Sequence, residues 1–150
     1  MRWKQFLEIL LKKENITDEY LEYCRISEFD GGLEGIFSKF DALYTEFSGE
    51  EPPYEVFEEL LPTLKLVLAT VESTDIAIQI NGRVRGSPLD VWLVITTAVI
   101  LLSRLIYHTG KREIDFQYFK KYTKFMKEEF GISESDSKYL IEKILEHLRK

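Results

Sequence analysis

The chain has 150 residues, of which 45% are hydrophobic and 31% charged, and its formal net charge is −6. These fractions are ordinary for a globular protein, and the length fits one domain with a sizeable hydrophobic core. The single cysteine, Cys24, excludes an internal disulfide and suits a reducing compartment. Residues 1–8 carry charge throughout and lack the apolar core and cleavage site of a signal peptide, so we expect a cytoplasmic protein.

Charge is divided unevenly along the chain. Residues 1–75 contain 7 Lys or Arg and 17 Asp or Glu, a formal charge of −10, whereas residues 76–150 contain 13 and 9, a formal charge of +4. An asymmetry of this kind is typical of surfaces that face different partners. Asn and Gln are scarce while Lys and Glu are plentiful, which is the compositional bias of thermophile proteins.

The N-terminal part of the chain predicts two helices. Over residues 2–14, apolar side chains recur at helical spacing. Thr17 is placed to cap a short second helix, whose first turn contains Asp18 and Glu19, where the helix dipole favours negative charge. These signals predict that the chain begins with one longer and one shorter helix.

Two further helices are predicted on either side of an acidic loop. A break at Phe29–Gly32 precedes an apolar stripe over residues 33–47, and Asp30 is expected to cap that helix. Residues 48–53 form a proline-containing loop, a weak candidate for a domain boundary that we interpret as a loop within one domain. Residues 54–71 are again helical in pattern, and Pro62 is expected to kink this helix or to start a second one.

One small β-hairpin is predicted over residues 75–86. Residues 75–80 alternate with period two, and Asn81-Gly82 is a strong hairpin signal. A three-residue loop with a bulge at Gly82 pairs Ile78 with Val84 and keeps the apolar and charged faces separate. Because a lone hairpin is marginal in water, we expect it to pack on helices or to pair with a partner's edge.

The longest apolar segment predicts a central helix over residues 88–109. Ser87 provides a cap, Pro88 suits the first helical position, and Gly110 suits the helix end. Residues 91–102 are apolar on every side, so we expect this helix to be buried on every side. The uncharged run of 13 residues from Val91 to Ser103 spans roughly 20 Å, which is too short for a hydrocarbon core of roughly 30 Å.

Two amphipathic helices complete the prediction. The first runs from about residue 115 to 130 and ends at Gly131, and its inner face comprises Tyr118, Phe119, Tyr122, Phe125 and Met126. The second is capped by Ser133 together with Asp136, or by Ser135 alone. Its apolar stripe comprises Leu140, Ile141, Ile144, Leu145 and Leu148. The whole pattern predicts an all-α, single-domain bundle of about six or seven helices over residues 1–150.

The residues that most often carry chemistry are sparse. His108 and His147 lack Cys, His or carboxylate neighbours at metal-ligand spacing. Cys24 fits a buried apolar face, and a couple with His108 has no support in the sequence. The pairs at 50–51 and 58–59 offer carboxylates for acid–base work, although such acidic runs are common on surfaces. With no phosphate-binding glycine loop and no nucleophile motif, we expect no catalytic, cofactor or metal site.

Basic residues in the second half are the candidates for binding nucleic acid or a protein partner. In the predicted hairpin, Arg83 and Arg85 are placed to contact phosphates. The alternative is that they are solvated charges that balance the acidic residues of the N-terminal half. Along the helix after Gly110, a lysine stripe is placed to follow a nucleic-acid backbone, or is an ordinary solvated face. The candidate residues are Arg83, Arg85, Lys111, Arg112, Lys120, Lys124 and Lys127.

The hairpin also has a local resemblance. Its eight-residue string resembles a hairpin near the C-terminal end of leucyl-tRNA synthetases, and reads Gln79-Ile80-Asn81-Gly82-Arg83-Val84-Arg85-Gly86. The flanking helices do not follow that family, so the resemblance implies a shared way of building a hairpin and no shared function.

Three hypotheses of function follow. The first is a non-catalytic interaction subunit of a larger cytosolic assembly, which binds a protein partner or a second copy of itself. The second is a nucleic-acid-binding accessory protein that uses the basic hairpin and the lysine-rich helix face. The third is a small enzyme without a recognisable motif. We expect neither a membrane partner nor a cofactor.

Overall fold

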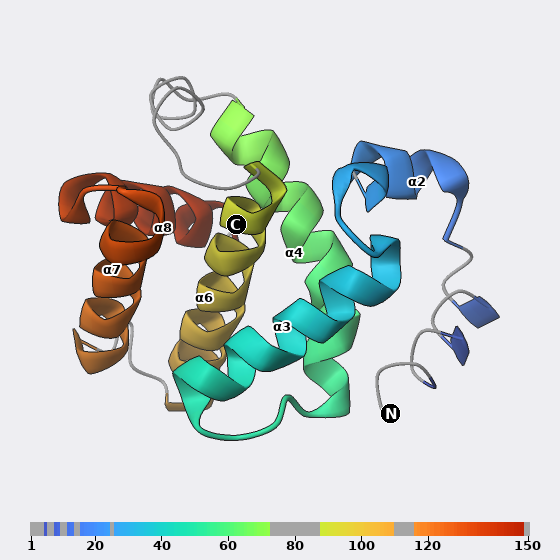
Figure 1. The fold of residues 1–150 in the computed structure, drawn as a ribbon. Helices are drawn as coiled ribbons and strands as arrows, with labels where there is room; N and C mark the ends of the chain where they lie inside the picture. The colour runs from blue at the N-terminus through green and yellow to red at the C-terminus, as the bar shows by residue number, and fades with distance from the viewer. Residues whose placement is uncertain are drawn as a thin grey trace.

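Helix α6 (Pro88–Thr109) is the element against which the other long helices pack (Figure 1). The computed structural model describes residues 5, 8–9, 12–13, 16–24, 26–72, 88–109 and 116–148. In addition to α6, the described residues form α2 (Asp18–Tyr23), the 3-10 helix η1 (Ile26–Glu28), α3 (Gly32–Ser48), α4 (Tyr54–Glu72), α7 (Phe116–Phe130) and α8 (Glu134–Leu148). The prediction of an all-α fold is therefore confirmed for this part of the chain.

The central helix has the predicted bounds and the predicted burial. Leu89 and every residue from Val91 to Leu102 are buried, because α3, α4, α7 and α8 all contact α6. Figure 1 shows α4 beside α6, α3 crossing in front of both, and α7 on the opposite side from α4. None of the described helices is both long and apolar enough to cross a membrane.

Two parts of the prediction fall wholly or partly outside the described residues. The β-hairpin over residues 75–86 lies outside them entirely. Of the predicted first helix, the described positions Gln5, Glu8, Ile9, Lys12 and Lys13 are helical. Besides these positions, the described residues form six α-helices and one 3-10 helix, and the prediction for the whole chain is about six or seven helices. The single-domain assignment stays a prediction.

The predicted cap of α3 is wrong. The N-cap is Gly31, in the left-handed conformation with φ of 83°, and no side chain caps the helix. The chain reverses so tightly here that a Cβ atom on Gly35 would overlap the Asp30 carbonyl oxygen. The backbone of Asp30 thus lies against the first turn of α3, and the Asp30 side chain does not cap the helix.

The structure shows what happens at Pro62 in α4, at the start of α8 and at the end of α7. Helix α4 runs through Pro62 as one element, with the proline on its exposed side, so no second helix starts there. Ser133 caps α8 by accepting a hydrogen bond of 3.2 Å from the Asp136 N–H, which selects this cap over Ser135. Gly131 ends α7 with a φ of 72°, as predicted.

The interface between α3 and α4 is built from aromatic rings. Phe40 of α3 meets Phe57 of α4 edge to face, with ring centroids 5.6 Å apart, and Phe37 lies 5.8 Å from the same ring. Such rings bury large apolar areas in favourable relative orientations. This cluster holds α3 against α4, and α3 also contacts both α6 and α7.

Candidate functional site: two pockets between α3 and α7

The structure describes three of the seven basic candidates. Lys120, Lys124 and Lys127 are all exposed on α7, and their spacing places them on one face of the helix. Lys124 lies 4.0 Å from Glu128, an exposed pair four residues apart that contributes little stability. The other four candidates, Arg83, Arg85, Lys111 and Arg112, lie outside the described residues, so whether they join this face stays a prediction.

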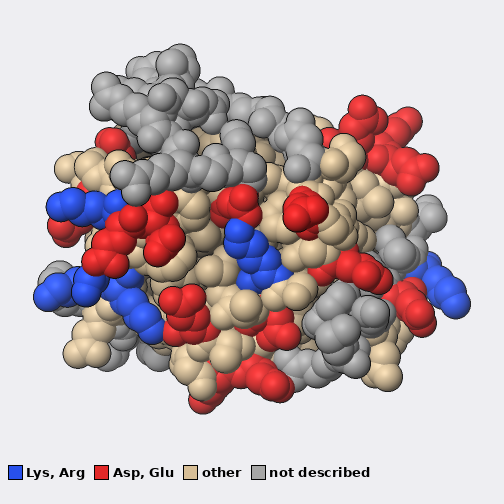
Figure 2. Space-filling model, in the orientation of Figure 1, with Lys and Arg blue, Asp and Glu red and all other residues tan. Residues whose placement is uncertain are grey.

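The lysine face lies among acidic side chains. Figure 2 shows Lys and Arg gathered on the side where α7 and α8 lie in Figure 1, with Asp and Glu between them. Acidic side chains predominate over the rest of the described surface in this view. The charge asymmetry of the sequence is therefore visible on this face: basic residues gather on the side of α7 and α8, and acidic residues predominate elsewhere.

The region from η1 to α4 is strongly acidic. Residues 26–72 contain 11 Asp or Glu residues and two lysines, Lys39 and Lys65. Lys39 pairs with Asp90 of α6, and Lys65 lies 5.2 Å and 5.0 Å from the ring centroids of Tyr20 and Tyr23. Because both lysines lie against partners within the fold, this surface presents a large excess of carboxylates.

The structure describes two of the three Cys and His residues, Cys24 and His147. In the part of the chain that the structure describes, no three His, Cys, Asp or Glu side chains are grouped to hold a metal ion. Burial raises the pKa of the Cys24 thiol to about 11, although Lys65 acts in the opposite direction. A thiol with such a pKa is a poor nucleophile near neutral pH. The His108 side chain lies outside the described residues, and His147 is exposed on α8.

Two pockets lie where α3 and α7 flank α6, and we call this strip the α3–α7 junction. The first, which we call the C-terminal pocket because it lies at the C-terminal half of α6, has a volume of about 230 Å³. The second, the N-terminal pocket, lies near the start of α6 and has a volume of about 340 Å³. Each pocket takes residues from α3, α6 and α7, which are distant in sequence.

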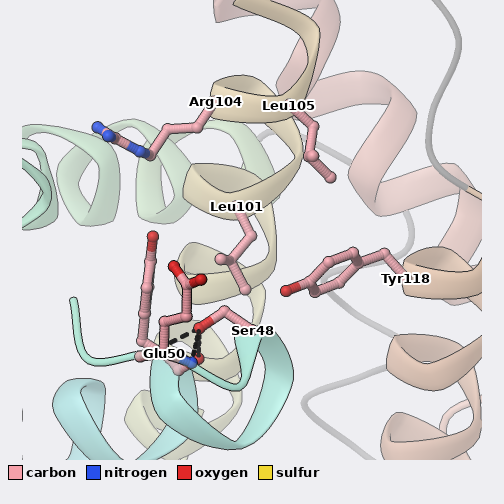
Figure 3. A pocket seen from close by; sticks show the side chains of 7 residues that line it. Ser48, Glu50, Leu101, Arg104, Leu105 and Tyr118 are labelled. Carbon is pink, nitrogen blue, oxygen red and sulfur yellow. Dashed lines mark hydrogen bonds between the residues drawn. The ribbon is translucent and has the colours of Figure 1, made fainter. Parts of the chain in front are cut away.

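The C-terminal pocket has an apolar wall and a polar rim. Leu101 and Leu105 of α6 point into it, and Tyr118 of α7 reaches in from the side opposite Glu50 (Figure 3). The Ser48 hydroxyl donates to the carbonyl oxygens of Tyr44 and Glu50, at 2.7 Å and 2.9 Å, and accepts from the Glu50 N–H. These bonds fix the loop after α3 and hold Glu50 at the rim.

Charged groups surround the buried Tyr44 hydroxyl at this pocket. Burial is the main cause that raises the pKa of Tyr44, while the nearby Arg104 charge lowers it and Glu50 and Glu59 raise it. The Arg104 guanidinium, whose charge lowers the pKa of Tyr44, lies 3.9 Å from the Glu59 carboxylate. The charged residues that line this pocket are thus Arg104 and Glu50, and Arg104 also pairs with Glu59 outside the lining.

The N-terminal pocket repeats this composition with different residues. Its apolar wall comprises Leu43, Val94, Phe125 and Phe130. Its rim contains the Lys39–Asp90 ion pair and the carboxylate of Glu129. Both pockets therefore combine an apolar wall with charged residues at the rim, and the N-terminal pocket has one more carboxylate in its lining than the C-terminal pocket.

A direct contact between α3 and α7 separates the pockets. The Lys121 ammonium donates a hydrogen bond of 2.7 Å to the Glu46 carbonyl oxygen and lies 6.0 Å from the centroid of the Phe47 ring. The same Phe47 ring meets Phe125 edge to face at 5.5 Å. This bridge holds α3 against α7, so the two pockets are distinct concavities.

Sequence reasoning missed most of the junction. The sequence pattern assigns no role to Arg104, and it predicts Tyr118 only as part of the inner face of its helix. The acidic pairs at 50–51 and 58–59 were singled out, but as acid–base candidates. A usable signal was the position of Asp90 and Arg104, the charged residues at either end of the buried part of α6.

Comparison of the chain with models of protein families, with curated proteins and with solved structures found no match.

Proposed function

We propose that this chain is a non-catalytic interaction protein, which works in the cytosol as a subunit of a larger assembly. The observation that carries the proposal is the excess of carboxylates over residues 26–72, where the sequence has 11 acidic residues and only two lysines, both of which lie against partners within the fold. A surface of one sign steers partners of the opposite sign and raises their rate of association. The exposed lysines of α7, with acidic side chains between them, give the molecule a second surface of mixed charge.

The test compares the size of the chain in native extract with its size when purified. We expect the chain in extract to elute in size-exclusion chromatography well above 17.7 kDa and to shift toward that mass in about 1 M salt, where charge interactions are screened within about 3 Å. Glu55→Lys with Glu58→Lys should weaken the complex, because both side chains are exposed on α4. Glu142→Lys with Glu146→Lys, the same charge change on α8, is the matched control. A chain that elutes at one mass in both settings contradicts the proposal.

The second candidate function is nucleic-acid binding. The observation that favours it is the exposure of Lys120, Lys124 and Lys127 on one face of α7. Each lysine that contacts a phosphate contributes about one unit to the slope of log affinity against log salt. Replacing all three with alanine should therefore lower the slope for DNA or RNA by about three units. Absence of binding at low salt, or an unchanged slope, counts against this function.

A further inference from the structure

We propose that α2 is a lid over the buried Cys24 thiol and that Lys65 of α4 is the latch that keeps this lid closed. The inference does not depend on the proposed interaction function, because it concerns contacts within the chain. It is carried by three observations: the position of Lys65 against two tyrosine rings of α2, the shallow packing of the rest of α2, and the burial of a thiol next to its last residue.

The latch consists of one cation and two aromatic rings. The exposed Lys65 side chain places its ammonium 5.2 Å from the centroid of the Tyr20 ring and 5.0 Å from that of the Tyr23 ring. Both distances are within the range of a cation–π interaction. Lys65 forms no ion pair with any carboxylate that the structure describes. Removing its charge therefore weakens two contacts between α4 and α2 at once.

The rest of α2 is anchored only at the edge of the core. The helix has six residues, none of which is fully buried, and its main contact among the described elements is the 3-10 helix η1. Tyr20 and Leu21 are partly buried against the core, whereas Tyr23 is 50% exposed. Figure 1 shows α2 at the edge of the molecule, on the far side of α4 from α6. An element with so few buried contacts opens at a lower free energy than the whole fold.

The burial of Cys24 depends on this helix. Cys24 is the C-cap residue of α2, its N–H donates a hydrogen bond of 3.1 Å to the Tyr20 carbonyl oxygen, and its side chain is 0% exposed. Because Cys24 is joined to the last turn, movement of α2 away from α4 carries the thiol out of the core. Cys24 is also the single cysteine of the chain, so any reaction with a thiol reagent reports on the lid.

The experiment measures the rate at which Cys24 of the full chain reacts with the aromatic disulfide dithiobis(nitrobenzoate). The Cys24 thiolate attacks one sulfur of the reagent, a mixed disulfide forms, and the coloured aromatic thiolate leaves. Lys65→Met should raise the rate about fivefold or more, because two cation–π contacts at an exposed site are lost. Lys120→Met, the same change at an exposed position of α7, should leave the rate unchanged. Equal rates for these two variants would overturn the latch.

The direct effect of the Lys65 charge on the thiol has the opposite sign. That charge lowers the pKa of Cys24, so its removal alone would leave less thiolate and slow the reaction. A faster reaction of Lys65→Met therefore reports opening of the lid. Lys65→Arg, which keeps a cation that stacks on aromatic rings, should react at the original rate. If Lys65→Arg reacted as fast as Lys65→Met, the charge would not be the latch.

A double-mutant cycle tests whether Lys65 and the exposed ring act together. Tyr23→Leu should raise the rate about twofold or more, because it removes one of the two rings. In the double variant with Lys65→Met, the increase should fall short of the product of the two single effects, since both substitutions remove the same contact. Effects that multiply fully would show that the two residues act independently and would overturn the latch.

Dependence on urea separates opening of the lid from unfolding of the whole chain. Opening one short helix exposes little surface, so the reaction rate should change little between zero and about 1 M urea. The urea midpoint of Lys65→Met, followed by circular dichroism, should equal that of the original chain. A rate that rises with urea in step with global unfolding would show that the thiol is reached only in the unfolded chain, and α2 would not be a lid.

Discussion

Two adjacent threonines in α6 are buried alike but bonded differently. Both side chains are 0% exposed. The Thr97 hydroxyl donates a hydrogen bond of 2.8 Å to the Leu93 carbonyl oxygen, whereas the Thr96 hydroxyl has no hydrogen-bond partner among the described residues. Burying a polar group without a partner costs about 1–3 kcal/mol. This pair therefore separates the effect of burial from the effect of a hydrogen bond.

We predict that Thr96→Val raises the free energy of unfolding by about 1 kcal/mol, because valine keeps the shape and removes the unsatisfied hydroxyl. Thr97→Val is the matched control and should leave the free energy of unfolding unchanged or lower, because it also removes a bond. Urea denaturation of the two variants measures both values. Equal effects at the two positions would contradict the assignment of their bonding.

Buried protonated groups predict a loss of stability at alkaline pH. Burial raises the pKa of Cys24 from 9.0 to about 11 and raises the pKa of Tyr122 well above its ordinary value. Between the unfolded and folded pKa values the unfolded chain has lost the proton and the folded chain keeps it. The unfolded state then binds fewer protons, so the free energy of unfolding falls as pH rises.

We therefore expect the contribution of Cys24 to be complete below about pH 9 and to be lost as pH rises through about 11. Cys24→Ala should flatten the fall in unfolding free energy across this window. Tyr122→Phe should flatten it only above about pH 10, where an unfolded tyrosine ionises. Urea denaturation at a series of pH values gives these slopes, and parallel curves for all three proteins would refute the prediction.

At the scale of a helix, Gly35 near the start of α3 departs from the usual effect of glycine. Alanine normally stabilises a helix interior by up to about 1 kcal/mol relative to glycine. Here a Cβ atom would overlap the Asp30 carbonyl oxygen and lie 3.4 Å from the Phe29 ring. The close approach of the Asp30 backbone thus requires glycine at this position.

We predict that Gly35→Ala lowers the free energy of unfolding by about 1–3 kcal/mol, since the overlap forces the backbone before α3 to shift. Ser38→Ala, at an exposed position of the same helix, should raise it by a few tenths of a kcal/mol or leave it unchanged. Thermal denaturation of both variants provides the comparison. A stabilising Gly35→Ala substitution would contradict the described turn.

At the scale of the whole molecule, α6 couples the other long helices. Helices α3, α4, α7 and α8 all contact it, and their buried residues form one continuous core. Removing any one of these helices exposes the apolar surface of α6, so partial unfolding is costly. The loop at residues 48–53, the weak candidate for a domain boundary, connects two helices that both pack on α6.

We predict a single cooperative unfolding transition. Far-ultraviolet circular dichroism, which follows all helices, and tryptophan fluorescence, which includes the buried Trp92, should give the same urea midpoint. Ile95→Ala should move both midpoints together, with a loss of about 2–5 kcal/mol. Two separated transitions would instead divide the chain near residues 48–53.

The sequence alone determined the features that depend on neighbours within a few residues. The bounds of α6 follow from the start signal at Pro88 and the stop signal at Gly110, and its burial follows from its continuous apolar composition. The end of α7 at Gly131 and a serine cap on α8 follow from local backbone and side-chain chemistry. Each of these signals involves residues within one or two helical turns of each other, so it can be recognised from the sequence alone.

Contacts between distant segments depend on the three-dimensional path of the chain. The approach of the Asp30 carbonyl to Gly35 depends on the path of the chain before α3, and that path made the predicted Asp30 cap wrong. The two pockets depend on how α3 and α7 cross α6, which brings Glu50 toward Arg104 and Glu129 toward Asp90. Crossing angles are set by the packing of whole helix surfaces, so no local pattern in the sequence encodes them.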